Sequence, residues 1–266
     1  MINTIIHSEN NPARLRILLQ SVRKNCFGEF NLNVLHRSAG SDYEPLYENL
    51  KTEFEDLNIN WTGYSNFKEA VLRFVQNNSE LTMFLRDDNV FYEPIDSKII
   101  YQTMKSNQDS VCFSLRLGRN TKLCRNMNTA NTLLGEVEIM DGQVIKWDWS
   151  KHYLDYNFFP SEAHTFRTIE FIKMIKQVAF NNFDELEENM YEVFEHFPKN
   201  MMCSFIKSVI VKDIAGPDNK QINQMYTNEK PIELSEMDFS TVDGCWAYIP
   251  KPTRELKKVE EPETNI

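Results

Sequence analysis

The sequence predicts an α/β protein in which a mostly parallel central sheet is flanked by helices, with more β-hairpin content in the second half. Apolar runs of strand length alternate with segments of helical periodicity, and this alternation is typical of parallel sheets wound by helices. Of the 266 residues, 41% are hydrophobic, which is enough to fill one large core. We therefore expect one domain over residues 1–249, with halves at 1–116 and 117–249, and a flexible tail at 250–266, where charged runs and prolines replace apolar periodicity.

The overall composition argues against nucleic-acid binding, a membrane span and a zinc site. A formal net charge of −10 argues against nucleic acid, because phosphate binding requires a dominant basic surface. No apolar run approaches the roughly 20 residues that span a bilayer. The chain opens on a strand without a charged leader, so we expect a cytoplasmic protein with no transmembrane segment. The five cysteines lack the paired spacing of a zinc site and are expected to be reduced thiols.

The first half is expected to begin with a buried strand at Ile2–Ile6, followed by a polar loop and a helix. Asn11 suits the helix N-cap, and Pro12 suits the first helical position, where a missing N–H costs nothing. A helix N-terminus in this place is able to face a phosphate. The side-chain donors near it are Ser8, Asn10 and Arg14.

The other elements follow from the same periodicities. Asn66 with Glu69 resembles a capping box that opens a helix, and Asp141-Gly142 is a strong two-residue hairpin signal between residues 133–139 and 143–146. Further strands are expected at 32–36, 83–86, 111–115 and 208–211, and further helices at 43–54, 169–178 and 184–194. In the last of these helices, Glu187 and Glu188 are expected to form solvated surface.

The apolar run Met83–Phe91 is interrupted by two carboxylates and a carboxamide, Asp87, Asp88 and Asn89. Hard ions such as Mg²⁺ or Mn²⁺ are usually held by one or two carboxylates while a substrate diphosphate completes the shell. Asp and Asn also favour strand ends as ordinary turn residues. The loop after the first strand and this acidic turn both follow the carboxyl ends of strands, where α/β proteins bind ligands, and this convergence favours a functional site.

Three groups in the second half are further candidates. The basic residues Arg116, Arg119, Lys122 and Arg125 form either phosphate contacts or a solvated loop. Trp147-Asp148-Trp149 follows the hairpin, and its rings either stack on a sugar or fill the core. Glu162 and His164 have a spacing that suits a base and a ligand in one loop, although structural histidines and carboxylates near helix starts share this pattern.

Four segments together resemble GT-A-type nucleotide-sugar glycosyltransferases, particularly a bacterial and viral group related to family 2. They are Ser8–Pro12, Val34–Ser38, Phe84–Phe91 and Phe159–His164, and the similarity spans roughly residues 1–200. The resemblance implies a GT-A-like single domain with an aspartate-rich metal motif of the D-x-D kind at the end of the fourth strand. This chain has Asp87-Asp88-Asn89 there, with a neutral carboxamide in the last position.

The resemblance also implies an activity and a set of roles. The implied reaction moves a glycosyl group from a nucleotide diphosphate sugar to an acceptor hydroxyl, in glycan or polysaccharide synthesis, with inversion and with Mn²⁺ or Mg²⁺. The implied metal ligands are Asp87, Asp88, Asn89 and His164. Glu162 is the expected general base, with Asp148 or Asp155 as the alternative. The residues expected to hold the donor are Ser8, Asn10, Arg14, Arg37, Lys68, Arg86 and Asp87.

Two other classes of function remain open. A sugar nucleotidyltransferase would share the sheet and the metal but usually needs a glycine-rich basic loop after the first strand, and the chain holds only eight glycines in total. A non-catalytic binding or scaffold protein on a degenerate fold is suggested by Asn89 and by Glu162-Ala163, where the family has aspartate and glycine.

Overall fold

The computed structural model describes residues 1–40, 42–76, 79–124, 129–130, 137–152, 156, 161–194, 197–212, 222–223, 226–227, 232–240 and 242. Several predictions made from the sequence lie outside these residues. They are Arg125, the strand portion at 133–136, Asp155, the Phe159-Pro160 pair and the tail at 250–266.

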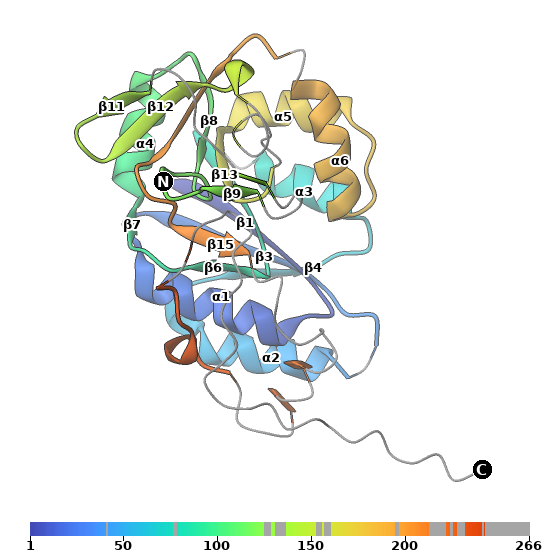
Figure 1. Ribbon diagram of the computed structural model, residues 1–266. Coiled ribbons are helices and arrows are strands. Elements are labelled where there is room, and N and C mark those ends of the chain that lie inside the picture. Colours follow the sequence, from blue (N-terminus) through green and yellow to red (C-terminus); the bar gives the residue numbers. More distant parts are fainter. Residues whose placement is uncertain are drawn as a thin grey trace.

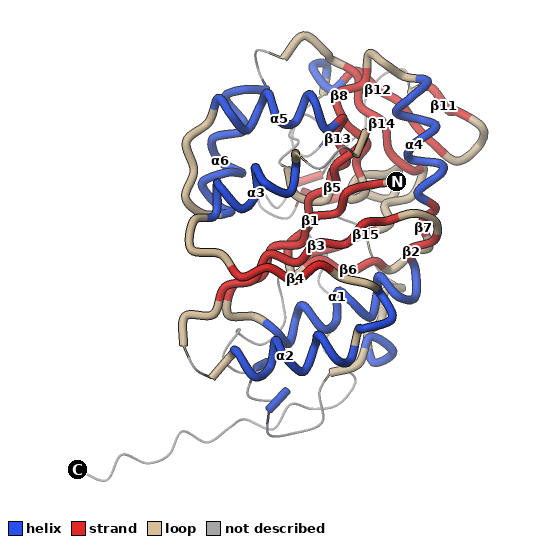
Figure 2. Tube along the Cα trace, turned by 180° about the vertical axis from the view of Figure 1, so that it is seen from behind, coloured by secondary structure: helices blue, strands red, loops and turns tan. Residues whose placement is uncertain are grey.

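A nine-stranded sheet forms the centre of the molecule (Figures 1 and 2). Its order from one edge to the other is β11 (Glu138–Met140), β12 (Val144–Asp148), β14 (Met201–Phe205), β8 (Ser110–Ser114), β13 (His164–Arg167), β5 (Leu81–Arg86), β1 (Ile2–Glu9), β3 (Phe30–Arg37) and β4 (Asn60–Gly63). Only β12 and β13 run against the other strands of this sheet. The expected mostly parallel central sheet is therefore confirmed, as is the hairpin in the second half.

Helices cover both faces of the sheet (Figure 2). One core holds side chains from α1 (Pro12–Asn25), α2 (Glu44–Glu53) and α4 (Ser97–Ser106), and the other holds side chains from α3 (Phe67–Val75), α5 (Thr168–Gln177) and α6 (Phe183–Phe194). Strand β1 contributes to both, because Ile2 and Ile6 point to the first core and Ile5 to the second. A strand that is covered on both faces has apolar residues at successive positions, so its sequence is a continuous apolar run.

Short strand pairs lie outside the main sheet. β6 (Asn89–Phe91) pairs with β15 (Ile210–Lys212), β2 (Cys26–Phe27) with β7 (Ile95–Asp96), and β9 (Leu123–Cys124) with β10 (Thr129–Ala130). Short 3₁₀ segments lie at Glu55–Leu57, Trp149–Lys151 and Leu234–Glu236. The pairing of β6 with β15 brings Lys212 opposite Asn89, directly beside the acidic turn.

Local signals explain several boundaries. The Asn66 side chain accepts a hydrogen bond from Glu69 N at 3.1 Å, so it caps α3 as predicted. The hairpin between β11 and β12 turns through Asp141 and Gly142, at φ of 49° and 67°, the left-handed conformation that such a turn requires. Trp147 does not form an exposed sugar platform. It is fully buried, because β12 is covered on both faces, and its Nε1 donates to Tyr156 O at 3.3 Å.

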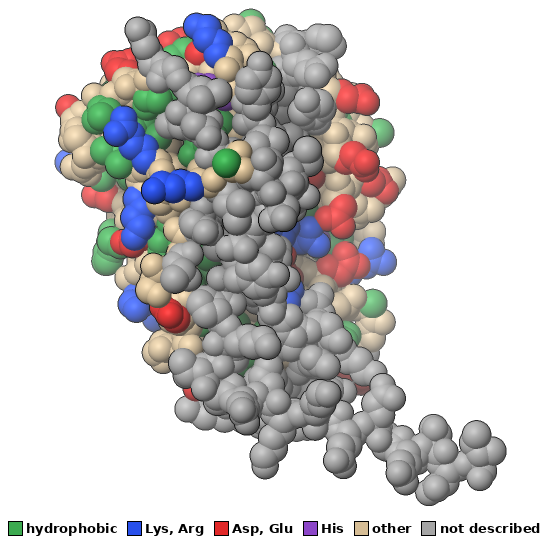
Figure 3. Space-filling model, in the orientation of Figure 1, with side chains coloured by type: hydrophobic (Ala, Val, Ile, Leu, Met, Phe, Trp, Pro, Cys, Tyr) green, Lys and Arg blue, Asp and Glu red, His purple; other side chains and the backbone are tan. Residues whose placement is uncertain are grey.

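Among the described residues visible in Figure 3, acidic side chains gather on the side of α6 and basic ones are scattered. This distribution agrees with the net charge of −10. Within the described part of the chain, no helix combines the length and the apolar character needed to cross a bilayer.

Candidate active site

The carboxyl ends of β1 and β5 meet at one edge of the sheet, where His7 pairs with Arg86. The acidic turn follows at once, and Asp87 N donates to His7 O at 2.9 Å. The loop before β13 runs alongside β5, since Ala163 N donates to Phe84 O at 2.7 Å. This arrangement carries the Glu162 side chain to the end of β5.

Four side chains form a polar cluster at this edge: the buried Asp88, Asn89 and Glu162, and the partly buried Lys212. Asn89 Oδ1 accepts from Arg86 N at 2.9 Å, and its Nδ2 donates to Glu162 Oε1 at 2.8 Å. Lys212 Nζ donates to Glu162 Oε2 at 3.0 Å and lies 3.8 Å from Asp88 Oδ2. Asp88, Asn89 and Glu162, which the sequence predicts to share one site, lie together in the structure. No sequence pattern indicates Lys212.

The charges of the cluster oppose one another. Burial raises the pKa of Glu162, but the cations of Lys212 and Arg116 outweigh it and hold that pKa below its ordinary value. Burial and the nearby charge of Glu162 raise the pKa of Asp88 to about 7. Burial also raises the pKa of Asp87, to about 6. At neutral pH Glu162 is thus the firmly ionised carboxylate, and a second cation would help to ionise the acidic pair.

Glu187 of α6 is not the solvated residue expected from the sequence. It accepts hydrogen bonds from Ser161 Oγ and, at 3.1 Å, from Glu162 N, so it holds the loop that carries the candidate base. Burial, followed by the charge of Glu162, raises its pKa to about 7. Its spacing from the buried Phe183 and Met190, four and three residues away, places it on the inward stripe of the helix.

A cavity of about 230 Å³ opens in front of the acidic pair. It is lined by His7, Glu9, Asn11, Arg14, Arg86, Asp87, Asp88, Asn182, Phe183 and Asp184. Arg86 forms part of its wall, because its Nη1 lies 2.7 Å from Asp184 Oδ1 and its guanidinium stacks over the Phe183 ring at 5.2 Å. The cavity therefore combines carboxylates, guanidinium donors and one aromatic face.

The loop after β1 lies at the edge of this cavity. Asn11 occupies the N-cap position of α1, but its side chain makes no cap; its Nδ2 instead donates to Asp87 Oδ1 at 3.2 Å. Ser8 is buried and shares a hydrogen bond of 2.8 Å with Tyr47. Asn10 has a φ of 53°, and its Oδ1 accepts from Ala39 N at 2.6 Å.

The predicted donor-binding residues therefore divide into two groups. Arg14, Arg86 and Asp87 line the cavity. Ser8 and Asn10 lie in the loop beside it, and Arg37 lies 3.7 Å from the cavity residue Glu9. Lys68 is not brought to this edge, since it lies on α3 and donates to Val178 O at 2.7 Å.

Asp148 lies at the opposite end of the sheet. It pairs with Met201, which pairs with Ser110 at the start of β8, whereas the acidic cluster follows the strand ends. Its carboxylate accepts from Ser150 N at 3.1 Å and pairs with Lys151 at 3.0 Å. The geometry gives it a capping role there and no access to the cavity.

The four predicted metal ligands do not converge as a set. In the described residues, no group of three or more His, Cys, Asp and Glu side chains is arranged to hold a metal ion. Both polar atoms of the Asn89 side chain are engaged, and His164 pairs with Phe84 in the body of β5, with its Nδ1 bound to Glu162 O at 2.8 Å. Asp88 Oδ1 is buried without a hydrogen-bond partner, and so is His164 Nε2. Of the predicted ligands, Asp87 and Asp88 are the carboxylates that could hold a cation, whereas both polar atoms of the Asn89 side chain are already engaged.

Comparison with known proteins adds evidence on the fold. No protein-family model and no curated protein sequence matches this chain. Among solved structures, S. aureus TarS matches with a TM-score of 0.51 and 13% identity, over 88% of this chain and 41% of that one. TarS 1-349 in complex with UDP matches with the same score and identity, over 88% of this chain and 67% of that one. The chain spans about two fifths of the longer TarS chain. At this identity the likeness shows a shared GT-A-like α/β fold.

Proposed function

We propose that this protein is a glycosyltransferase that moves a sugar from a nucleotide diphosphate sugar to an acceptor hydroxyl. The observation that carries the proposal is that the acidic pair, Asp87 and Asp88, lines a cavity at the strand ends and that Lys212 links Asp88 to the buried Glu162. The fold supports it, because it is shared with TarS 1-349, whose structure is known in complex with UDP. Ligands of α/β proteins bind at this edge of the sheet.

In the proposed reaction, the acceptor oxygen forms a bond to the anomeric carbon while the bond from that carbon to the diphosphate oxygen breaks. Glu162 receives the proton of the acceptor hydroxyl as general base. Since one displacement occurs at the anomeric carbon, its configuration inverts. Asn89 and Lys212 hold the two oxygens of Glu162, which fixes the direction of the carboxylate.

The diphosphate is assigned to the cavity in front of the acidic pair. Arg14 and Arg86 line it and supply guanidinium donors that suit phosphate oxygens. We propose that Asp87 and Asp88 hold Mn²⁺ or Mg²⁺ together with the diphosphate. When bound, such an ion neutralises charge on the leaving group. The unpartnered Asp88 Oδ1 supports this placement.

A thermal-shift screen of UDP, GDP, CDP and dTDP, each with and without Mn²⁺, tests the proposal. A ligand that binds only the native state raises its melting temperature, so one diphosphate is expected to give a shift that requires Mn²⁺. Asp88→Asn should abolish the Mn²⁺-dependent shift. Asp148→Asn, at the far end of the sheet, serves as the matched control and should keep the shift. Absence of a shift with all four diphosphates would refute nucleotide-sugar binding.

A non-catalytic nucleotide-binding protein is the second candidate. One observation favours it: Lys212 Nζ lies 3.0 Å from Glu162 Oε2, so the candidate base is already paired with a cation. This reading predicts nucleotide binding without release of diphosphate from any donor sugar. The two candidates are separated by incubating the protein with sugar donors of the nucleotide that gives a thermal shift. Release of the nucleoside diphosphate would indicate a transferase, and its absence a binding protein.

A further inference from the structure

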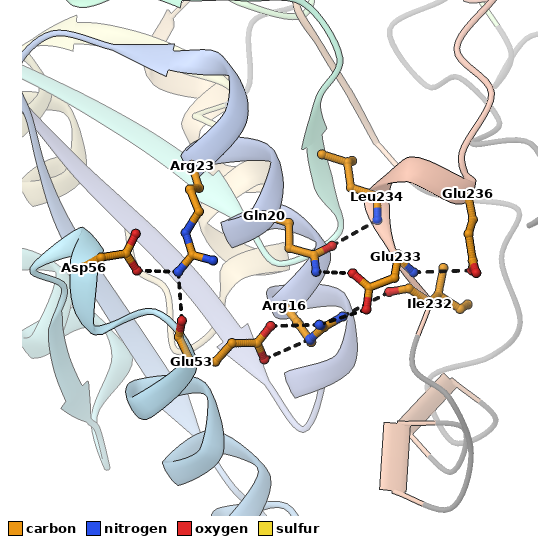
Figure 4. A network of polar contacts seen from close by, with 9 residues as sticks. All are labelled: Arg16, Gln20, Arg23, Glu53, Asp56, Ile232, Glu233, Leu234 and Glu236. Atoms are coloured by element: carbon orange, nitrogen blue, oxygen red, sulfur yellow. Dashed lines mark hydrogen bonds and ion pairs between the residues drawn. The ribbon is translucent and has the colours of Figure 1, made fainter.

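The segment after β15 lies along α1. We name its described residues 222–223, 226–227 and 232–236 the C-terminal strap. Arg16 of α1 pairs with Glu233 at 3.0 Å and with Glu53 of α2 at 2.8 Å, and its Nη1 donates to Ile232 O at 3.3 Å (Figure 4). Gln20 donates to Glu233 Oε2 at 2.6 Å and accepts from Leu234 N at 3.0 Å (Figure 4).

Apolar contacts fix the strap to the same helix. The buried residues Ile222, Ile232 and Leu234 form one cluster with Ala13 and Ile17 of α1. Because polar and apolar contacts both follow α1 from its first turn to Gln20, the strap has a defined register on this helix. That register determines what lies at the helix N-terminus.

Asn223 lies at this N-terminus and is only 4% exposed. Its Oδ1 accepts a hydrogen bond from Ala13 N at 3.1 Å, and its Nδ2 donates to Asn10 O at 2.9 Å. Ala13 N belongs to the first turn of α1, where backbone donors have no partner inside the helix. One carboxamide therefore joins the two sides of the Asn11-Pro12 step.

The loop that Asn223 joins carries cavity residues. Asn11 donates to Asp87 Oδ1 at 3.2 Å, and both Asn11 and Arg14 line the 230 Å³ cavity. Asn10, at φ of 53°, has a backbone conformation that a non-glycine residue keeps only when its surroundings hold it. The hydrogen bond from Asn223 Nδ2 to Asn10 O, between residues 213 positions apart in the chain, helps to keep this conformation.

We propose that Asn223 is a positioning residue for donor binding: it fixes the Asn10–Arg14 loop so that Asn11 and Arg14 face the diphosphate. The inference rests on the proposed function, because it assigns the cavity to a nucleoside diphosphate. It adds that Asn223, through its contacts with Ala13 and Asn10, determines affinity for the donor and leaves the chemical step unchanged.

The test is isothermal titration of the full-length chain with UDP, GDP, CDP and dTDP in the presence of Mn²⁺, for wild type and Asn223→Ala. Loss of two buried hydrogen bonds should raise the Kd of the bound diphosphate about three- to tenfold. In turnover assays the KM for the donor should rise by a similar factor while kcat stays unchanged. Amide exchange at Ala13 should become faster, because its N–H loses the Oδ1 acceptor.

Glu233→Gln is the matched control. It weakens the contact of the strap with Arg16 and Gln20 but leaves the carboxamide of Asn223 in place, so the Kd should equal that of wild type. Asn223→Asp is a second variant if Asn223→Ala does not fold. It keeps an acceptor for Ala13 N, favoured at a helix N-terminus, and loses only the donor to Asn10 O, so a smaller rise of Kd is expected.

The outcomes separate the inference from the function on which it rests. Wild-type binding with an unchanged Kd in Asn223→Ala, despite faster exchange at Ala13, would overturn the positioning role and leave the proposed function intact. An equal rise of Kd in Glu233→Gln would also overturn it, because the effect would then come from the strap as a whole. If the wild type binds none of the four diphosphates, the proposed function fails and the inference with it.

Discussion

Lys212 brings an ammonium group to Glu162, fifty residues earlier in the chain, and both side chains are largely shielded from solvent. A buried ion pair of this kind contributes little net stability, but removing one partner leaves the other charge uncompensated. The pair therefore has its main consequence in the protonation state of Glu162, which must be ionised to accept a proton.

Replacement of this ammonium should change the pH dependence of transfer. In Lys212→Met the pKa of Glu162 should rise, because burial remains while the nearest cation is lost. Turnover at neutral pH should fall and recover partly at higher pH, and the free energy of unfolding should fall by about 3–5 kcal/mol. The measurement is the pH profile of kcat/KM. Lys212→Arg, which keeps the charge, is the control. Superimposable profiles for Lys212→Met and wild type would contradict the role of Lys212 in keeping Glu162 ionised.

The base itself is tested by Glu162→Gln. The carboxamide has nearly the same shape and keeps an oxygen for Asn89 or Lys212, so the fold and donor binding should persist. Transfer should slow by about 10²–10⁴-fold, the usual contribution of a general base. Asp148→Asn should leave turnover at its wild-type level, because Asp148 lies at the other end of the sheet. Wild-type turnover in Glu162→Gln would exclude it as the base.

At the scale of elements, α6 fixes the loop that carries Glu162. Glu187→Ala should lower the free energy of unfolding by about 1–3 kcal/mol, because Glu162 N and Ser161 Oγ lose their acceptor. Glu187→Gln keeps an acceptor oxygen and should be close to wild type. Glu188→Ala, at an exposed position of the same helix, provides the matched control for helix propensity. Chemical denaturation of the four proteins checks this ranking, and equal losses in both alanine variants would contradict it.

The same helix shows how far periodicity predicts structure. Most strands and helices of the first half follow from apolar spacing, although β4 and α4 were not predicted, and the strand-end position of Asp87 and Asp88 follows from the alternation of these elements. Glu187 was assigned to solvent because its charge outweighed its spacing from Phe183 and Met190. The sequence leaves Trp147 open between a sugar platform and the core, because aromatic rings serve both; the structure buries it.

At the scale of the whole molecule, contacts between distant segments determine the site. Lys212 reaches Glu162 through the pairing of β15 with β6, and Asn223 reaches Ala13 across 210 residues. No local sequence pattern predicts either contact, because each depends on where the segment after the last strand of the central sheet packs. The sequence could therefore predict the acidic pair and the candidate base. It could not predict that Lys212 lies between them or that Asn223 binds the loop after β1.

The same assembly of carboxylates predicts how stability depends on pH. Burial raises the pKa of Asp88 from 3.8 to about 7 and that of Asp87 from 3.8 to about 6, so between pH 4 and these values the folded state binds more protons than the unfolded state. The contribution of these two groups to the free energy of unfolding should therefore fall as the pH rises from about 4 to about 7, by up to about 1.4 kcal/mol per pH unit for each group.

Glu162 acts in the opposite direction and in a different window. Its pKa is lowered, so its stabilising contribution is present above the pKa of the unfolded chain and is lost as the pH falls below it. Urea denaturation from pH 4 to pH 8 should therefore give a steeper decline through neutrality in the wild type than in Asp88→Asn, since the carboxamide cannot ionise. Addition of Mn²⁺ with the matching diphosphate should reverse the decline in the wild type, because a bound cation stabilises the ionised pair, and should not do so in Asp88→Asn. An equal slope in both proteins would show that Asp88 is not the group whose charge the site must compensate.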